Sequence, residues 1–281
     1  MTKILRYLYQ KFVVTRRISE LQIKEAGLDS DGHAFVTLKD GMTFYGPKPA
    51  GKEKKFYSTI LSKSVKNQLP FHCYQVAIDI VIRFYEGNLK WGGPAKEAFY
   101  HVKEGNVIAE MGAFRGYYTL YLSKKVGPDG HIIAIEPIPD NIEYLRKNIA
   151  INEIENVTIV PKGVWNENDQ KTFQRKTTDY QSGSIDIVYQ DQEALVIEVN
   201  TLDKILSDQK VNEVDFMLIQ LNGAEFEALE GLSKSKPKNL AIASRYNKNQ
   251  RNIAREIQEL LMQRGYAINI LNEKFIYAQL N

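Results

Sequence analysis

Short apolar runs alternate with amphipathic stretches from residue 95 to the end of the chain. Mainly aliphatic runs bounded by Gly, Pro, Asn or Asp predict buried strands, and stretches with apolar residues at helical spacing predict helices. The predicted strands are 107–111, 131–135, 157–160, 194–199, 215–221, 239–244, 266–271 and 275–280, and the predicted helices are 95–102, 117–125, 140–152, 201–206, 223–232 and 249–264. This alternation predicts an α/β fold with a doubly wound, mostly parallel sheet and a C-terminal antiparallel strand pair.

Residues 1–95 follow a different pattern and predict a separate α+β appendage. Its predicted elements are a β-hairpin over 34–38 and 42–45 with its turn at 39–41, a loop over 46–55, and helices over 57–69 and 74–85. Residues 96–281 form the predicted main domain. Residues 165–195 are polar and alternate only weakly, with short strand candidates at 172–173 and 185–188. We expect the appendage and this weakly patterned stretch to shape the substrate pocket.

Residues 1–17 carry apolar side chains at nearly helical spacing, and basic side chains on the opposite face. This pattern has two interpretations. The helix either lies on an anionic membrane surface, as a peripheral contact, or docks on the protein body or on a second subunit. The helix and the closing strands are candidate contact surfaces for a homodimer.

Composition narrows the class of protein. The 281 residues carry a net charge of +3, which is too small to indicate a nucleic-acid partner. A single cysteine, Cys73, excludes an internal disulfide and suits a reducing, cytoplasmic compartment. The four histidines lack metal-ligand spacing, so we predict no metal site. We expect neither a signal peptide nor a membrane span.

The strand predicted over 107–111 runs directly into Gly112 and Gly116, and a predicted helix follows. Glycine lets the backbone approach a ligand closely, and the free N–H groups of a helix start favour a negative group. The next predicted strand ends in Glu136, where an acid can accept hydrogen bonds from both hydroxyls of a ribose. The pattern therefore predicts a cradle for a nucleoside.

The spacing of the glycines indicates which nucleoside. A dinucleotide site uses three glycines as G-x-G-x-x-G, whereas this loop has two, spaced G-x-x-x-G, with Glu110 two residues before the first. S-adenosylmethionine has a ribose and an amino-acid carboxylate but no pyrophosphate, so it needs no third glycine. We predict this cofactor and keep an NAD-dependent oxidoreductase as a distant alternative.

Several motifs in order resemble the FkbM-type family of S-adenosylmethionine-dependent methyltransferases. They are Glu110–Thr119 (EMGAFRGYYT), Glu136–Asn148 (EPIPDNIEYLRKN), Asn156–Val160 (NVTIV), Thr201–Asp203 (TLD) and Val214–Glu225 (VDFMLIQLNGAE). The resemblance covers roughly residues 104–277. It implies a Rossmann-like class I methyltransferase fold and O-methylation of a sugar or another small-molecule hydroxyl, with a small molecule or glycan as the acceptor.

The cofactor-binding residues expected from the cradle and the resemblance lie at the carboxyl ends of the predicted strands. They are Glu110, Gly112, Ala113, Phe114, Arg115, Gly116, Thr119, Glu136, Pro137, Ile138, Gly163 and Gln220. Ile138 is placed to cover one face of the adenine. Arg115 has two open interpretations, pairing with the cofactor carboxylate or pointing to solvent.

The chain departs from the family after the fourth core strand. Where the family has approximately Asp-x-Glu-Gly-x-Glu, this chain has Gln220 and Asn222, and Glu225 remains. We treat these three as the candidate catalytic residues, although Glu225 could equally serve as a partner of the helix dipole. A hydroxyl acceptor usually needs a general base. Either the base comes from elsewhere, with Glu225, His72 and Asp179 as candidates, or the acceptor needs no strong base, or the protein is an inactive cofactor-binding or scaffold subunit.

Overall fold

The structure is a computed structural model that describes residues 15–48, 65, 69–85, 95–176, 179–184, 192–243, 247–248, 251–271 and 275–281. Several predictions lie outside the described residues: most of the N-terminal helix over 1–17, nearly all of the helix over 57–69, and the strand over 185–188. Among the described residues, no helix combines the length and the apolar content needed to cross a bilayer.

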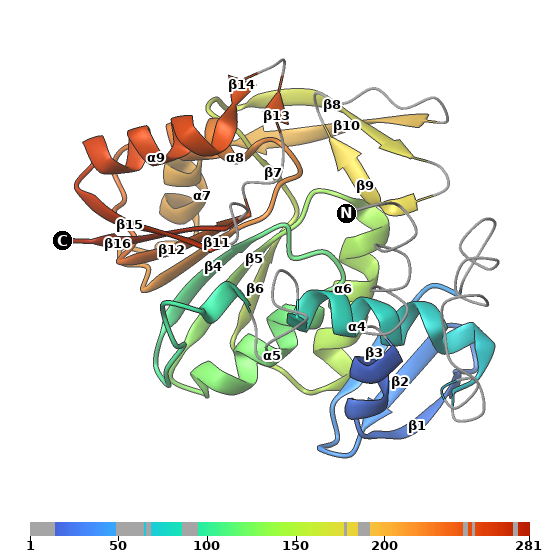
Figure 1. The fold of residues 1–281 in the computed structure, drawn as a ribbon. Coiled ribbons are helices and arrows are strands. Elements are labelled where there is room, and N and C mark those ends of the chain that lie inside the picture. Colours follow the sequence, from blue (N-terminus) through green and yellow to red (C-terminus); the bar gives the residue numbers. More distant parts are fainter. Residues whose placement is uncertain are drawn as a thin grey trace, which may run out of the picture.

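A seven-stranded sheet forms the centre of the molecule (Figure 1). Its strands are β4 (Val107–Met111), β5 (His131–Ile135), β6 (Val157–Val160), β11 (Phe216–Ile219), β12 (Asn239–Ala243), β15 (Tyr266–Leu271) and β16 (Phe275–Leu280). Their order is β15-β16-β12-β11-β4-β5-β6, and only β16 runs against its neighbours. This order defines the Rossmann-like class I fold, so the predicted mostly parallel sheet with an antiparallel C-terminal pair is confirmed.

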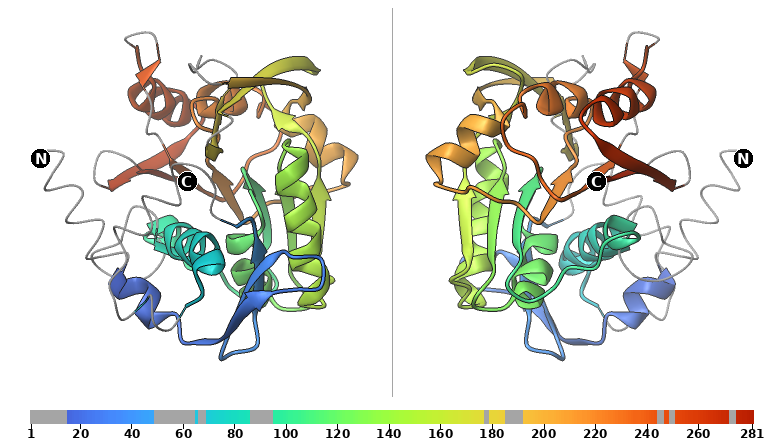
Figure 2. Two further views of the ribbon diagram at one scale, coloured as in Figure 1. Left: turned by 90° about the vertical axis from the view of Figure 1, so that its right-hand side faces the viewer. Right: turned by 90° about the vertical axis from the view of Figure 1, so that its left-hand side faces the viewer.

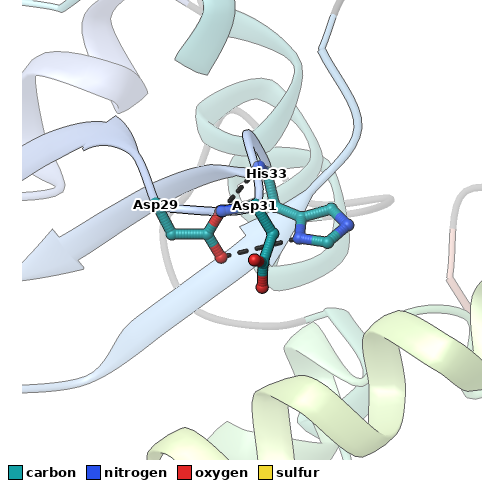
Figure 3. Close-up of side chains that lie close together, drawn as sticks. All are labelled: Asp29, Asp31 and His33. Carbon is teal, nitrogen blue, oxygen red and sulfur yellow. Dashed lines mark hydrogen bonds and ion pairs between the residues drawn. The ribbon is translucent and has the colours of Figure 1, made fainter.

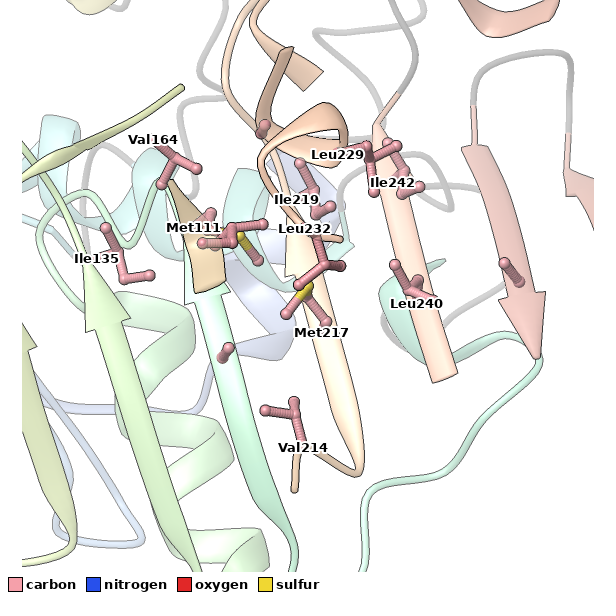
Figure 4. Packing of buried hydrophobic residues seen from close by; sticks show 14 of the residues in the cluster. Met111, Ile135, Val164, Val214, Met217, Ile219, Leu229, Leu232, Leu240 and Ile242 are labelled. Carbon is pink, nitrogen blue, oxygen red and sulfur yellow. The ribbon is translucent and has the colours of Figure 1, made fainter. Parts of the chain in front are cut away.

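Two layers of helices cover the sheet (Figures 1 and 2). One layer holds α4 (Tyr74–Tyr85), α5 (Tyr117–Val126) and α6 (Pro139–Ile151), and the other holds α7 (Leu202–Asp208), α8 (Glu225–Glu230) and α9 (Ile253–Gln263). The largest apolar cluster lies between the sheet and α7–α9, where Met111, Met217 and Ile219 pack against Leu229 (Figure 4). Side chains of opposite parity in the same strands pack against α5, because successive residues of a strand face opposite sides.

A smaller four-stranded sheet, ordered β7-β10-β8-β9, lies above the α7–α9 layer (Figure 1). Its strands are β7 (Gly163–Val164), β8 (Asp169–Lys176), β9 (Asp179–Ser184) and β10 (Gln192–Asn200). β8 is much longer than the strand predicted over 172–173, because it pairs antiparallel with β10 through eight residues. Its polar sequence carries little local signal, and the partner strand determines its length.

The helix predicted over 95–102 is wrong. The chain forms only a short 3-10 helix, η2 (Ala95–Glu97), and then extends. The Glu97 carboxylate accepts a hydrogen bond of 3.1 Å from the Val102 N–H, which a continuing helix would have paired with a backbone carbonyl. A side chain has therefore taken the place of a helical hydrogen-bond acceptor.

The N-terminal appendage contains a three-stranded sheet of β1 (Ile23–Leu28), β2 (Ala34–Leu38) and β3 (Thr43–Gly46). The predicted hairpin is confirmed as β2 and β3, and β1 is an additional strand. Asn148 of α6 holds this sheet against the main domain. Its side chain accepts from the Tyr45 N–H at 2.6 Å and donates to the carbonyls of Tyr45 and Arg115.

Asp29, Asp31 and His33 lie close together in the turn between β1 and β2 (Figure 3). The carboxylate of Asp29 accepts from the backbone N–H groups of Asp31 and His33, as a turn-forming aspartate does. The ammonium group of Lys147 lies 2.5 Å from Asp29 Oδ2 and 2.8 Å from His33 Nδ1, and it lowers the pKa of Asp29 to about 2. The cluster is therefore a turn that Lys147 joins to α6. The ammonium group of Lys147 supplies the positive charge that balances the Asp29 carboxylate.

We expect Asn148→Ala to destabilise the fold by about 3 kcal/mol, because the fully buried amide satisfies three backbone groups that water cannot reach. Urea unfolding would measure the change. The control is Asn166→Ala, which removes one exposed hydrogen bond to Glu230 and should cost less than about 0.5 kcal/mol. A loss below about 1 kcal/mol in Asn148→Ala would show that the sheet does not depend on this amide.

Candidate functional site

The strand order reverses beside β4, and ligands of open α/β sheets bind at such a point, outside the carboxyl ends of the strands. The loop after β4 begins at Gly112 and ends at Gly116, with φ angles of 78° and 80° that favour glycine. A Cβ atom on Gly112 would lie 2.2 Å from the carbonyl oxygen of Gln220, and one on Gly116 would lie 2.4 Å from Leu145 Cδ1. The two glycines therefore let the loop lie against the ends of β11 and α6.

Phe114 has a positive φ of 56°, an unusual conformation for a bulky residue. Its backbone N–H donates to Glu136 Oε2 at 2.8 Å. This hydrogen bond joins the loop after β4 to the end of β5, and it holds Phe114 in the left-handed conformation. The neighbouring residue, Ala113, donates its backbone N–H to the Ile135 carbonyl.

Glu136 is 4% exposed, and its other oxygen accepts from the Ile138 N–H and the Asn141 side-chain amide, both at 3.1 Å. Burial raises the pKa of this carboxyl, and the three hydrogen bonds partly offset that effect. Two carboxylate oxygens offer about four acceptor positions, so these three donors leave capacity for a ribose hydroxyl. The donor set therefore fits the predicted role for one of the two ribose hydroxyls.

Glu110 is also buried, and its carboxylate accepts from the Thr119 hydroxyl at 2.6 Å. Burial raises its pKa, while the nearby ammonium group of Lys96 and the Thr119 hydroxyl act in the opposite direction. Lys96 lines a small cavity together with Glu110 and Gln220, and burial lowers its pKa to about 8. Sequence reasoning missed Lys96, because it precedes the first core strand and belongs to no motif.

Arg115 is 3% exposed, so the interpretation that it points to solvent is wrong. Its Nη1 donates to Asp79 Oδ2 of α4 at 2.8 Å. Arg83 of α4 also reaches the loop, with its guanidinium carbon 4.3 Å from the Phe114 ring centroid. The charges of Asp79, Glu136 and Glu110 oppose the desolvation that lowers the pKa of Arg83. Sequence reasoning did not place either α4 residue in the site, because no local pattern indicates which loop a buried helix faces.

Ile138 caps the N-terminus of α6 and belongs to an apolar cluster with Trp165, Phe173 and Ile197. This cluster extends from the end of β5 to the small sheet, as a nonpolar wall suited to an adenine ring. Pro137, half-buried, lies between Glu136 and Ile138. Gly163 is placed in β7, where a Cβ atom would lie 2.9 Å from Val199 Cγ1, so its closest neighbours are in the small sheet.

The loop after β11 contains Gln220 and Asn222, and the third candidate catalytic residue, Glu225, begins α8. The half-buried Gln220 continues the sheet by donating its N–H to the Met111 carbonyl at 3.2 Å, and Asn222 has a positive φ of 53°. The buried carboxylate of Glu225 accepts from the N–H groups of Leu221 and Gly223, each at 2.9 Å. Its oxygens therefore hold the loop in shape at the N-terminus of α8, which supports a structural role for Glu225 such as the helix-dipole interpretation.

The two other candidate bases lie elsewhere. His72 is in the short helix η1 (Phe71–Cys73) of the appendage, and its buried Nε2 has no hydrogen-bond partner among the described residues. Asp179 begins β9, and its side chain lies outside the described part of the chain. The backbones of both residues therefore belong to elements other than the loop after β11.

The fold and the cradle define the class: a Rossmann-like domain whose first two parallel strands carry a glycine loop and a buried acid, an arrangement suited to a nucleoside-type ligand. The model of the family described as "Methyltransferase FkbM domain" matches residues 110–268, which is more than half of the chain. The chain therefore belongs to the FkbM methyltransferase family. The predicted cofactor, S-adenosylmethionine, is confirmed by this membership.

Individual relatives match only short segments. An arsenite methyltransferase of Halobacterium salinarum is 34% identical over 61 residues, which are 22% of this chain and 16% of that protein. A protein-L-isoaspartate O-methyltransferase of Methanothrix thermoacetophila is 32% identical over 59 residues, 21% of this chain and 28% of that protein. The chain thus matches less than a third of the length of either relative.

Among solved structures, fibrillarin of Aeropyrum pernix with bound S-adenosylmethionine aligns with 92% of this chain and 99% of its own, at 13% identity and a TM-score of 0.45. A SAM-dependent methyltransferase of Aquifex aeolicus aligns with 70% of this chain and 89% of its own, at 15% identity and a TM-score of 0.40. These similarities are weak, and the fold assignment depends on the strand order described above.

We expect Glu136→Gln to weaken binding of S-adenosylmethionine by about tenfold or more, because the amide has one acceptor oxygen and would place an NH₂ group against existing donors. Isothermal titration calorimetry would measure the affinity. The control is Glu143→Gln on the exposed face of α6, which should leave the affinity unchanged. Equal affinities of wild type and Glu136→Gln would remove Glu136 from the cofactor site.

A second prediction concerns pH. Burial raises the pKa of Glu225 to about 7, above its usual 4.5, so between these values the folded state binds the proton that the unfolded state has released. Stability should therefore fall as pH rises from 4.5 to 7, by about 3 kcal/mol from this group. Urea unfolding at pH 5 and pH 8 would show a weaker pH dependence in Glu225→Gln. The same pH dependence in both proteins would contradict the assignment.

Proposed function

We propose that the protein is a methyltransferase that transfers the methyl group of S-adenosylmethionine to a hydroxyl of a sugar or another small molecule. The observation that carries this proposal is the Glu136 carboxylate fastened to a left-handed glycine loop within an FkbM domain. The relative from Methanothrix is named as an O-methyltransferase, which agrees with an oxygen acceptor. The sugar preference rests on the family resemblance.

The residues of this chain divide the task into binding, orientation and exclusion of water. Glu136 would accept a hydrogen bond from a ribose hydroxyl, and the loop from Gly112 to Gly116 would follow the amino-acid part of the cofactor. Ile138 and its apolar cluster would cover the adenine. The cofactor supplies an activated methyl group, so alignment of the acceptor and exclusion of water provide much of the remaining catalysis.

Two candidate functions, an active methyltransferase and an inactive subunit, differ in whether the protein needs a general base for the acceptor hydroxyl. Gln220 and Asn222 are amides, and the Glu225 oxygens already hold the loop. An enzyme would therefore take the acceptor proton on another group or use an acceptor that needs no strong base. The second candidate function, an inactive cofactor-binding or scaffold subunit, is favoured by the same two amides.

The remaining partner proposals concern surfaces. The membrane or docking role of the N-terminal helix stays a prediction, because residues 1–14 lie outside the described part. The homodimer also stays a proposal, with the edge strand β15 as a candidate contact surface. A small-molecule or glycan acceptor would enter beside the appendage and the small sheet.

Incubation with S-adenosylmethionine and a library of sugars and small hydroxylated molecules should yield methylated product and S-adenosylhomocysteine in equal amounts, detected by mass spectrometry. Glu136→Gln should produce at least about tenfold less at subsaturating cofactor. Cofactor binding with no product from any acceptor would favour the scaffold function. Absence of cofactor binding would reject both candidate functions.

A further inference from the structure

Helix α4 carries three polar residues on one face of an otherwise apolar helix. Gln75, Asp79 and Arg83 are spaced four residues apart, so they follow one side of the helix. We call these three residues the α4 stripe. Gln75 and Asp79 are 2% and 1% exposed, and Val76, Ile80 and Val81 around them are completely buried. Polar groups in such surroundings are costly unless each has a specific partner.

The partners of the α4 stripe lie in the glycine loop of the cofactor site. Asp79 accepts from Gln75 Nε2 and from Arg115 Nη1, both at 2.8 Å. The Asp79 and Arg115 side chains are 1% and 4% exposed, so this ion pair is fully desolvated. Arg115 lies between the two left-handed glycines of the loop, and its carbonyl accepts from Asn148. Both its side chain and its backbone are therefore held.

Residues of the α4 stripe and the loop also surround Phe114, whose backbone N–H donates to the Glu136 carboxylate. The guanidinium carbons of Arg83 and Arg115 each lie 4.3 Å from the Phe114 ring centroid, which is a cation–π distance. A strained backbone conformation such as that of Phe114 persists only where its surroundings impose it. Two residues of the α4 stripe supply these surroundings: Arg83 contacts the Phe114 ring directly, and Asp79 holds Arg115, whose guanidinium contacts the same ring.

Stability alone is a weak explanation for this arrangement. A buried ion pair is commonly no more stabilising than a pair of apolar residues of the same size, because the charges lose their hydration. An Asp and an Arg do supply a directional hydrogen bond, which fixes the position of the loop more sharply than apolar packing. The stripe also lies outside residues 110–268, where the family model matches.

We propose that Asp79 is a positioning residue for S-adenosylmethionine: through Arg115 it holds the loop between Gly112 and Gly116 in its cofactor-binding shape. The appendage thereby forms part of the cofactor site without touching the cofactor. This inference rests on the proposed function only in taking S-adenosylmethionine as the ligand.

The test is Asp79→Asn, which keeps the shape of the side chain and removes its charge. Titration calorimetry should show binding of S-adenosylmethionine weakened by about tenfold or more, since small displacements of binding groups have effects of this size. Hydrogen–deuterium exchange without cofactor should be faster at the amides of residues 112–116. The control is Asp40→Asn, which breaks an exposed ion pair between the appendage and Lys124 of α5 and should change neither quantity.

A double variant, Asp79→Leu with Arg115→Met, separates positioning from structural support. It replaces the ion pair with apolar side chains, so part of the stability lost in Asp79→Leu alone should be recovered, although Gln75 still lacks its acceptor, while the weak binding and fast loop exchange remain. Recovery of wild-type affinity in this variant would overturn the proposal, as would Asp79→Asn binding within twofold of wild type. If Asp79→Asn does not fold, the double variant decides alone. If wild type binds no S-adenosylmethionine, the proposed function fails, and loop exchange still decides whether Asp79 holds the loop.

Discussion

The hydrogen bond from the Phe114 N–H to the Glu136 carboxylate is the contact on which the site depends. It joins the ends of β4 and β5, which are adjacent parallel strands. A buried carboxylate is unfavourable by itself, and here three donors offset the loss of hydration. The loop must turn through two left-handed glycines to offer that N–H. The shape of the loop and the position of the Glu136 carboxylate therefore depend on each other.

The charges of the site come from both parts of the chain. The main domain contributes the acids Glu110 and Glu136 and also Lys96, while Arg83, which interacts with both acids, belongs to α4 and precedes residue 95. Interactions between charges strengthen as water is excluded. The boundary predicted at residue 95 therefore separates two sequence patterns, whereas the electrostatics of the cofactor site cross it.

In the loop after β11, amides stand at positions 220 and 222, where the family pattern has acids. Glu225 holds the loop through two backbone N–H groups, and Gln220 still continues the sheet by its N–H. Amides at positions 220 and 222 can donate and accept hydrogen bonds, but they cannot accept a proton at neutral pH. The hydrogen bonds that hold this loop are thus independent of any acid–base role.

The sequence by itself determined the core strands, most of the helices that cover them and the position of Glu136, because buried strands and amphipathic helices leave local apolar patterns in the sequence. The strands over 107–111, 131–135 and 157–160 match the structure residue for residue. Tertiary structure alone decided the length of β8, the loss of the helix over 95–102 and the partner of Arg115. Each depends on a group brought close only by folding: β10, the Glu97 carboxylate, and Asp79, which lies 36 residues away in the chain. No local pattern records such pairings.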